Sequence, residues 1–257
     1  VRRNSSSGGV FSLLAEIIFE KGGCAFGAYF DEHMTLKHGI AYDEHTLEKM
    51  RGSKYVQSNM CDIYKAVKNK IKENEWVLFV GTPCQVAALN LFLKKIDTTR
   101  LITVDILCHG VPSQKMLKRY IKEKSSGKNA IDIQFRDKEF GWRCDYIKIV
   151  FDDGTSYVEN VHSDEYVKGF LKNVILRKCC HNCSFSDFPR QGDISIGDFW
   201  GIDTVDMGEN DGKGTSIVVS NSEKGKELAE ILKKKCLSFK EEDVEPLLLP
   251  NRFKALY

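Results

Sequence analysis

The sequence predicts a mixed α/β fold, in which helices flank a central, mainly parallel sheet and additional antiparallel hairpins and a cysteine-bearing loop region complete the chain. Two apolar runs, 76–80 and 101–107, end in turn residues and are each followed by a helical pattern. Apolar runs of this length, separated by a helix, are typical of buried parallel strands. Farther along, alternating segments at 145–151 and 155–161 enclose an Asp-Asp-Gly turn signal and predict an antiparallel hairpin.

Length and composition indicate a core that the chain can form by itself. With 257 residues, 42% of them hydrophobic, it can bury about three quarters of the surface that its unfolded state exposes. We therefore expect one domain over 1–257, with a subdivision near 125 between an α/β part (1–125) and a part that carries the hairpins, a cysteine cluster and the C-terminal α/β elements (126–257). Because the sequence opens on Val1 rather than Met, we expect it to be a segment of a longer protein.

Charge and hydropathy exclude two classes of partner. The 38 Lys and Arg residues nearly cancel the 36 Asp and Glu residues, so the net charge of +2 gives no field that would attract nucleic acid. No apolar run approaches the length that spans a bilayer, and the first residues lack the apolar region of a signal peptide. We expect no nucleic-acid partner, no membrane insertion and a cytoplasmic location.

The first half of the chain begins with an amphipathic helix. Apolar residues from Val10 to Ile18 recur at helical spacing, and Gly22-Gly23 provides the stop. Alternating or amphipathic patterns then predict strands at 24–30 and 35–42 and helices at 44–50 and 61–73.

The two apolar strands and their helices follow, and the second half adds the hairpins. A strand at 130–136 precedes the hairpin, and a helix at 164–177 is expected to turn Leu171 and Val174 inward and to lead into the cysteine cluster. Two more strands, one beginning near 192 and one at 216–220, and a helix at 222–235 complete the pattern.

Four of the nine cysteines have spacings that favour a metal site. An odd number of cysteines and the lack of an export signal argue against a disulfide framework. Cys180 and Cys183 form a C-x-x-C pair, while Cys84 and Cys108 each follow one of the apolar strands. Because the carboxyl ends of neighbouring parallel strands meet at one edge, these four thiols can form one set. Such a set suits Zn²⁺ or an iron-sulfur cluster, and the spacing does not distinguish them.

The other cysteines have no partner at a ligand spacing. We expect Cys24, Cys61, Cys144 and Cys236 to serve as small buried hydrophobic residues, which is a common use of free cysteine. Cys179 is expected to point away from the thiol set.

Two polar segments are candidates for binding a phosphate-bearing cofactor. The first is a Ser/Gly loop that leads into the first helix, where backbone N–H groups and the helix dipole favour an anion; it consists of Ser5, Ser6, Ser7, Gly8 and Gly9. The second combines glycine, hydroxyls, a cation, an aromatic ring and an amide; it includes Gly52, Ser53, Lys54, Tyr55, Gln57 and Ser58. The alternatives are an ordinary helix cap for the first segment and a plain polar loop for the second.

Seven motifs in series resemble the coenzyme F420 hydrogenase/dehydrogenase beta-subunit family, where F420 denotes a 5-deazaflavin. They are Ser5–Gly9, Gly52–Ser58, Gly81-Thr-Pro-Cys-Gln85, Cys108-His-Gly110, Phe135-Arg-Asp-Lys138, the Cys180/Cys183 pair and Gly197-Asp-Phe-Trp-Gly201. The resemblance covers most of the chain in the same order. It implies an FAD and iron-sulfur oxidoreductase that moves electrons between a hydride carrier and iron-sulfur partners.

The resemblance also implies roles for particular residues. Cys84, Cys108, Cys180 and Cys183 would hold a 4Fe–4S cluster, and the two polar segments would line the FAD site. Lys54 is our candidate for a catalytic charge that stabilises the anionic reduced flavin. Coenzyme F420 is the implied substrate, although relatives also occur in bacteria that make none. Many relatives carry a ferredoxin-like module ahead of this domain, so the electron partner is expected to be such a missing N-terminal module or a separate iron-sulfur protein.

Two hypotheses from other classes use the same cysteines. A zinc-stapled interaction subunit would employ the four thiolates structurally, without redox chemistry. A thiol-disulfide enzyme would use Cys180 and Cys183, but such pairs begin a helix after a strand, whereas this pair is expected to follow a long helix.

Overall fold

A six-stranded sheet forms the centre of the computed structural model, which describes residues 1–257 except 140, 143–145, 201–210 and 242–257. The strands lie in the order β2-β1-β3-β4-β8-β9, and the inner four run parallel while the outer two pair antiparallel. Their bounds are β1 (Cys24–Phe30), β2 (Leu36–Ala41), β3 (Val77–Gly81), β4 (Leu101–Ile106), β8 (Ile194–Asp198) and β9 (Ser216–Ser220). This architecture confirms the predicted mainly parallel central sheet.

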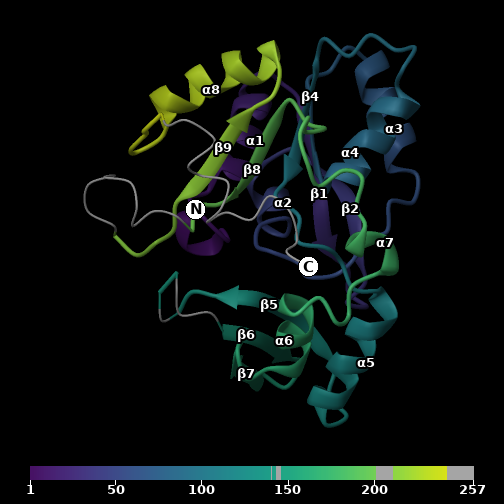
Figure 1. Ribbon diagram of the computed structural model, residues 1–257, viewed down its shortest axis with the longest axis vertical. Helices are drawn as coiled ribbons and strands as arrows, with labels where there is room; N and C mark the ends of the chain where they lie inside the picture. Colours follow the sequence, from purple (N-terminus) through teal and green to yellow (C-terminus); the bar gives the residue numbers. More distant parts are fainter. Residues whose placement is uncertain (140, 143–145, 201–210, 242–257) are drawn as a thin grey trace.

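Helices cover both faces of this sheet (Figure 1). On one face lie α1 (Val10–Glu20) and α8 (Glu223–Lys235), and on the other lie α3 (Ile63–Lys72) and α4 (Pro83–Phe92). The apolar stripe of α1 explains its position, because Leu14 and Ile18 are buried in one cluster with Leu78 and Val104 of the inner strands. The short α2 (Glu44–Glu48) follows β2. Among the described residues, no helix has the length and apolarity that crossing a membrane requires.

A smaller antiparallel sheet faces the carboxyl ends of the parallel strands (Figure 1). It consists of β5 (Ala130–Asp137), β6 (Tyr146–Phe151) and β7 (Ser156–Asn160), in that order. The helices α5 (Gln114–Ser125) and α6 (Glu165–Leu171) pack on it, and their buried residues Leu117 and Tyr166 share a core with Phe135 and Ile149. Between α6 and β8 lies the four-residue helix α7 (Lys178–His181), and a 3-10 turn, η1 (Arg2–Asn4), begins the chain.

The predicted helix 164–177 is wrong in its second half. Asn173 adopts a left-handed φ of 64°, and the N–H of Val174 donates to Gly169, which closes the helix after Leu171. Asparagine tolerates this conformation because its short polar side chain bonds locally. As a result Leu171 is 43% exposed and Val174 is 74% exposed, whereas the periodicity placed both inward.

The expectations for the unpaired cysteines are met in part. Cys24 is fully buried, as expected. Cys61 is exposed and has a φ of 41°, so its placement in the core was wrong: a turn before α3 holds it at the surface. Cys236 is only partly buried, and Cys144 lies outside the described residues.

Candidate functional site

The Ser/Gly loop lies at the carboxyl edge of the parallel sheet, where it is held by the start of β9. The N–H of Gly8 donates to Ser216 Oγ at 2.9 Å, and Ser7 Oγ donates to the Thr215 carbonyl at 2.5 Å. A Cβ on Gly8 would come within 2.9 Å of the Ser216 nitrogen, so only glycine fits this approach. Gly9 caps α1 with a φ of 90°, and the first N–H groups of the helix face outward without a capping side chain.

The second polar segment connects this loop to the cysteines. Ser53 Oγ donates to Ser6 Oγ at 2.8 Å, which brings the two predicted cofactor segments into contact. At its other end, Ser58 Oγ accepts from Gln85 Nε2 at 2.8 Å, directly beside Cys84. Because Ser53 and Ser58 are five residues apart, their Cα atoms lie at most about 18 Å from each other.

Gln57 extends the same segment to the other two cysteine-bearing stretches. Its N–H donates to the carbonyl of Pro112 at 3.0 Å, four residues beyond Cys108. Its side-chain oxygen accepts from the guanidinium of Arg177, the N-cap residue of the helix that carries Cys180. Six residues thus contact the Ser/Gly loop and all three stretches that carry the predicted ligands.

Lys54 has its ammonium group buried within its own loop. The Nζ atom donates to the carbonyls of Met50, Arg51 and Gly52 at 3.0, 2.6 and 3.1 Å. Burial lowers the pKa of Lys54 to about 7. Because an ammonium has three N–H donors and three carbonyls accept them, any action of Lys54 on a cofactor would be through its charge.

Cys108 lies within electrostatic range of the other three predicted ligands. Cys84 occupies the first turn of α4. Burial raises the pKa of Cys108 to about 12; the Gly110 N–H opposes that shift, and the charges of Cys84, Cys180 and Cys183 add to it. The four thiols therefore share one electrostatic environment.

Gly110 allows α7 to approach the Cys108 stretch. A Cβ there would lie 2.7 Å from Leu176 and 3.3 Å from the Cys180 Cβ, and the residue has a φ of 136°. Cys180 lies within this short helix and Cys183 follows it, whereas the sequence suggested a plain loop. Cys179 is exposed, but its side chain interacts with that of Cys180, so the expectation that it points away from the set is not met. Within the described ranges, which include all four predicted ligands, no group of three or more His, Cys, Asp or Glu side chains is placed so that it could hold a metal ion.

A buried ion pair fixes the cysteine stretches relative to one another. Arg190 Nη2 donates to Asp105 Oδ1 at 2.6 Å and to the Ile106 carbonyl at 3.2 Å, two residues before Cys108. Its Nη1 donates to the carbonyl of Ser186 at 3.2 Å. The Ser186 hydroxyl in turn donates to the Cys183 carbonyl at 3.0 Å. Sequence reasoning missed this pair, although a carboxylate inside an apolar strand signals a buried cationic partner.

A set of aromatic and charged residues faces the Ser/Gly loop, and sequence reasoning assigned it no role. Trp142 and Trp200 stack with centroids 5.3 Å apart, and Arg136 lies 4.7 Å from the Trp200 centroid. Arg136 also pairs with Asp198 at 2.5 Å, and Trp142 Nε1 donates to the Ser6 carbonyl at 3.1 Å. Arg136, Asp198 and Trp200 come from the Phe135–Lys138 and Gly197–Gly201 motifs, so those motifs were the available signal, whereas Trp142 lies outside both. Gly201 of the latter motif lies outside the described residues.

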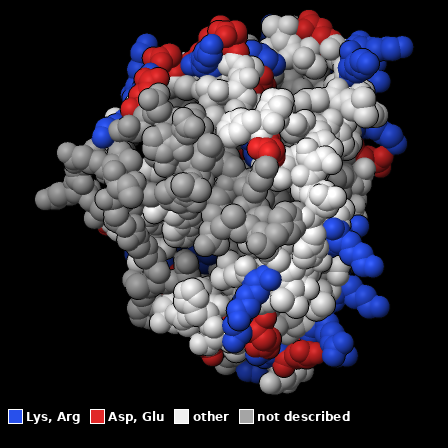
Figure 2. Space-filling view, in the orientation of Figure 1, with Lys and Arg blue, Asp and Glu red and all other residues white. Residues whose placement is uncertain are grey.

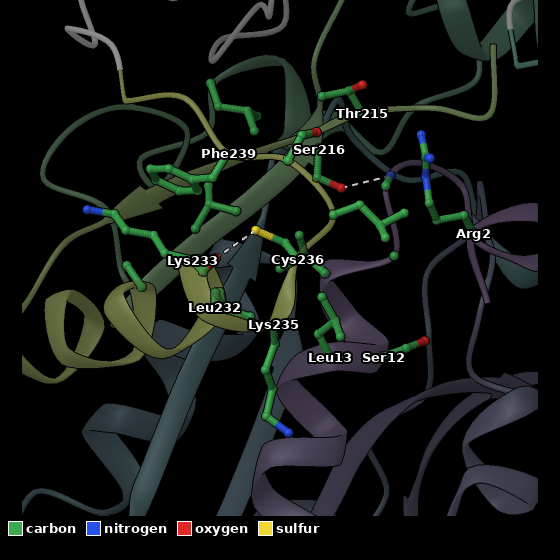
Figure 3. Close-up of a pocket in the computed structure, with 18 of the residues that line it drawn as sticks. Arg2, Ser12, Leu13, Thr215, Ser216, Leu232, Lys233, Lys235, Cys236 and Phe239 are labelled. Carbon is green, nitrogen blue, oxygen red and sulfur yellow. Dashed lines mark hydrogen bonds between the residues drawn. The ribbon is translucent and has the colours of Figure 1, made fainter. Parts of the chain in front are cut away.

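A cavity of about 890 Å³ opens beside the Ser/Gly loop, between α1, β9 and α8 (Figure 3). Arg2 and Ser216 lie at the end next to Gly8 and Gly9, whereas the remainder is lined by apolar residues such as Leu232 and Phe239 together with charged ones such as Lys233 and Lys235. Cys236 lines the cavity and donates to the Lys233 carbonyl at 3.5 Å, instead of joining the core. The sequence could not reveal this cavity, because its walls lie some two hundred residues apart.

The sheet brings the stretches that carry the four cysteines and the Ser/Gly loop to one edge. A family model for the C terminus of the beta subunit of coenzyme F420 hydrogenase/dehydrogenase matches residues 74–245, and the chain belongs to this family. The predicted resemblance is thus confirmed, and the family is one of oxidoreductases. The matched range contains Cys84, Cys108, Cys180 and Cys183, whereas both polar segments precede it.

A solved structure shares the fold. The chain is similar, at a TM-score of 0.63 and 18% identity, to a chain of the xenon-derivatised F420-reducing [NiFe] hydrogenase complex from Methanosarcina barkeri. The likeness covers 96% of this chain and 80% of that one. No curated protein matches the sequence.

Proposed function

We propose that the protein binds FAD and a 4Fe–4S cluster at the carboxyl edge of its sheet and moves electrons between a hydride carrier, coenzyme F420 or a similar compound, and an iron-sulfur partner. The observation that carries this proposal is the segment Ser53–Ser58, which contacts both the Ser/Gly loop and the cysteine stretches. An FAD exchanges hydride and single electrons, and a cluster exchanges single electrons, so the chemistry requires the two to be close.

The cysteines fit a cluster by donor type and by arrangement. Four thiols that influence one another's charge supply the four sulfur ligands of a 4Fe–4S cluster. Because each ligand of a cluster binds a different iron, the four thiols would surround the cluster and would not converge on one ion position. In this proposal Arg190 and Gly110 hold the Cys108 stretch against the stretch that carries Cys180.

The Ser/Gly loop fits the phosphates of a dinucleotide. Glycine at position 8 lets the backbone approach closely, and the start of α1 presents N–H groups and the positive end of its dipole. The adjoining cavity of about 890 Å³ lies in the range of cofactor sites, and Arg2 beside the loop is paired with Asp211. Lys54 would act on the flavin by charge alone.

Metal and sulfide analysis of variants tests the cluster. In anaerobically purified protein, Cys180→Ser or Cys183→Ser should remove most of the iron and acid-labile sulfide, because a cluster corner without thiolate is open to solvent. The matched control Cys236→Ser should leave both unchanged. Equal iron in all three variants would refute the ligand assignment. Stoichiometric zinc with no sulfide or flavin would establish the zinc-stapled alternative.

A further inference from the structure

The stretches that carry the four cysteines contain no acidic residue. Segments 76–96, 106–122 and 166–186 have no Asp or Glu, although the chain as a whole has 36 in 257 residues. Segments 106–122 and 166–186 contain eight Lys and Arg residues, and the two in segment 76–96, Lys94 and Lys95, lie at its far end. The near-neutral net charge therefore conceals a strong local excess of positive charge around the cysteines.

The fold assembles two of these segments into one surface. The N–H of Arg177 donates to the Val111 carbonyl at 3.0 Å, just before α5, and Lys124 at the end of α5 pairs with Glu165 at the start of α6 at 2.7 Å. Consequently α5 lies beside the α6–α7 segment with the two running in opposite directions. Figure 2 shows Lys and Arg side chains along the flank where Figure 1 places α5 and α7.

We define the basic rim as five exposed cations of this surface: Lys115, Lys118, Lys172, Arg177 and Lys178. Between them the ending of α6 exposes two apolar side chains, Leu171 and Val174, at 43% and 74%. Exposed Cys179 follows directly, next to the predicted ligand Cys180. Apolar residues surrounded by charged ones are the usual composition of a protein-docking patch.

We infer that the basic rim docks an acidic electron-transfer protein against the Cys180 side of the site, an inference that rests on the proposed function. Charge complementarity argues for an acidic protein surface, and Leu171 and Val174 give that surface apolar contact that a nucleic acid or lipid headgroup would not use. The patch is small, which suits the weak, transient encounters of redox partners.

Binding of an acidic bacterial ferredoxin to the purified, cofactor-loaded protein tests the inference. Calorimetric titrations at 20, 150 and 500 mM NaCl would compare wild type with the double variant Lys172→Glu/Lys178→Glu. The control Lys94→Glu/Lys95→Glu changes net charge equally, but its residues follow the far end of α4, about 15 Å along the helix from Cys84. We expect the rim variant to weaken binding about tenfold or more at 20 mM NaCl, with the difference shrinking at 500 mM.

The control should bind within about twofold of wild type at every salt concentration, since charge near the contact dominates steering. Val174→Ser should weaken binding without changing its salt dependence. Rim and control variants that bind equally well would overturn the inference, as would tighter binding of a DNA duplex or of phosphatidylglycerol vesicles than of the ferredoxin.

Iron, sulfide and flavin contents of each preparation separate this inference from the proposed function. A wild-type protein without cluster, whose ferredoxin binding still depends on the rim, would refute the proposed function and support docking. A cluster-loaded protein whose ferredoxin binding is unchanged by the rim substitutions would support the proposed function and refute docking at the rim.

Discussion

Arg190→Met is expected to destabilise the protein strongly, because it leaves a buried carboxylate without its cation. The side chains of Arg190 and Asp105 are 1% and 0% exposed. Asp105 Oδ1 accepts from the guanidinium at 2.6 Å, and Oδ2 accepts only backbone N–H groups, from Gln191 at 2.9 Å and Gly192 at 2.8 Å. Removing one partner of a buried ion pair lowers the free energy of unfolding by about 3–5 kcal/mol, because the remaining charge is uncompensated.

Urea unfolding followed by circular dichroism measures this loss. The double variant Arg190→Met/Asp105→Asn removes the unpaired charge, so it should cost less than the single variant, about 1–3 kcal/mol. Iron content should fall in Arg190→Met, because the guanidinium also holds the carbonyls of Ile106 and Ser186. The control Tyr120→Phe, which loses a buried 2.5 Å bond to Asp164, should keep its iron. The reasoning is refuted if the free energy of unfolding of Arg190→Met lies within about 1 kcal/mol of the wild-type value. It is also refuted if Arg190→Met is as stable as the double variant or more stable.

Three further predictions follow from individual residues. Burial lowers the pKa of His38 to about 4, so the free energy of unfolding should fall by about 3 kcal/mol as the pH drops from 6.5 to 4 and the buried imidazole becomes protonated. In His38→Gln, the free energy of unfolding measured in urea should depend less on pH over this range. A pH profile identical to that of the wild type would contradict this. Gly8→Val should weaken FAD binding in fluorescence titrations while iron stays near normal, because the added Cβ would meet Ser216; unaltered FAD affinity would place the cofactor elsewhere. Lys54→Ala should slow single-turnover flavin reduction more than it weakens FAD binding, and equal effects on both would point to a purely structural lysine.

The sequence predicted the features that depend on local pattern and strand direction. Cys84 and Cys108 follow apolar runs, and parallel strands place their carboxyl ends together, so their common edge could be predicted. Helix α1 and the hairpin at the Asp-Asp-Gly turn could be predicted for the same reason, because each depends on a pattern within one short segment.

Features that depend on contacts distant in sequence could not be predicted. The bonds that join Ser53 to Ser6 and Gln57 to Arg177 arise only when three segments pack together. Helical periodicity continued through Val174, but a single left-handed residue, Asn173, ended the helix and turned that valine outward.

Stopped-flow mixing of the anaerobic, cofactor-loaded protein with reduced coenzyme F420 tests the central claim most directly. Parallel experiments with NADH and NADPH identify the carrier. The account predicts that the flavin absorbance bleaches first, that the cluster absorbance near 400 nm then bleaches in the same protein, and that Cys183→Ser abolishes only the second phase. Flavin reduction that never reaches the cluster in the wild-type protein, or no reduction by any of the three carriers, would contradict it.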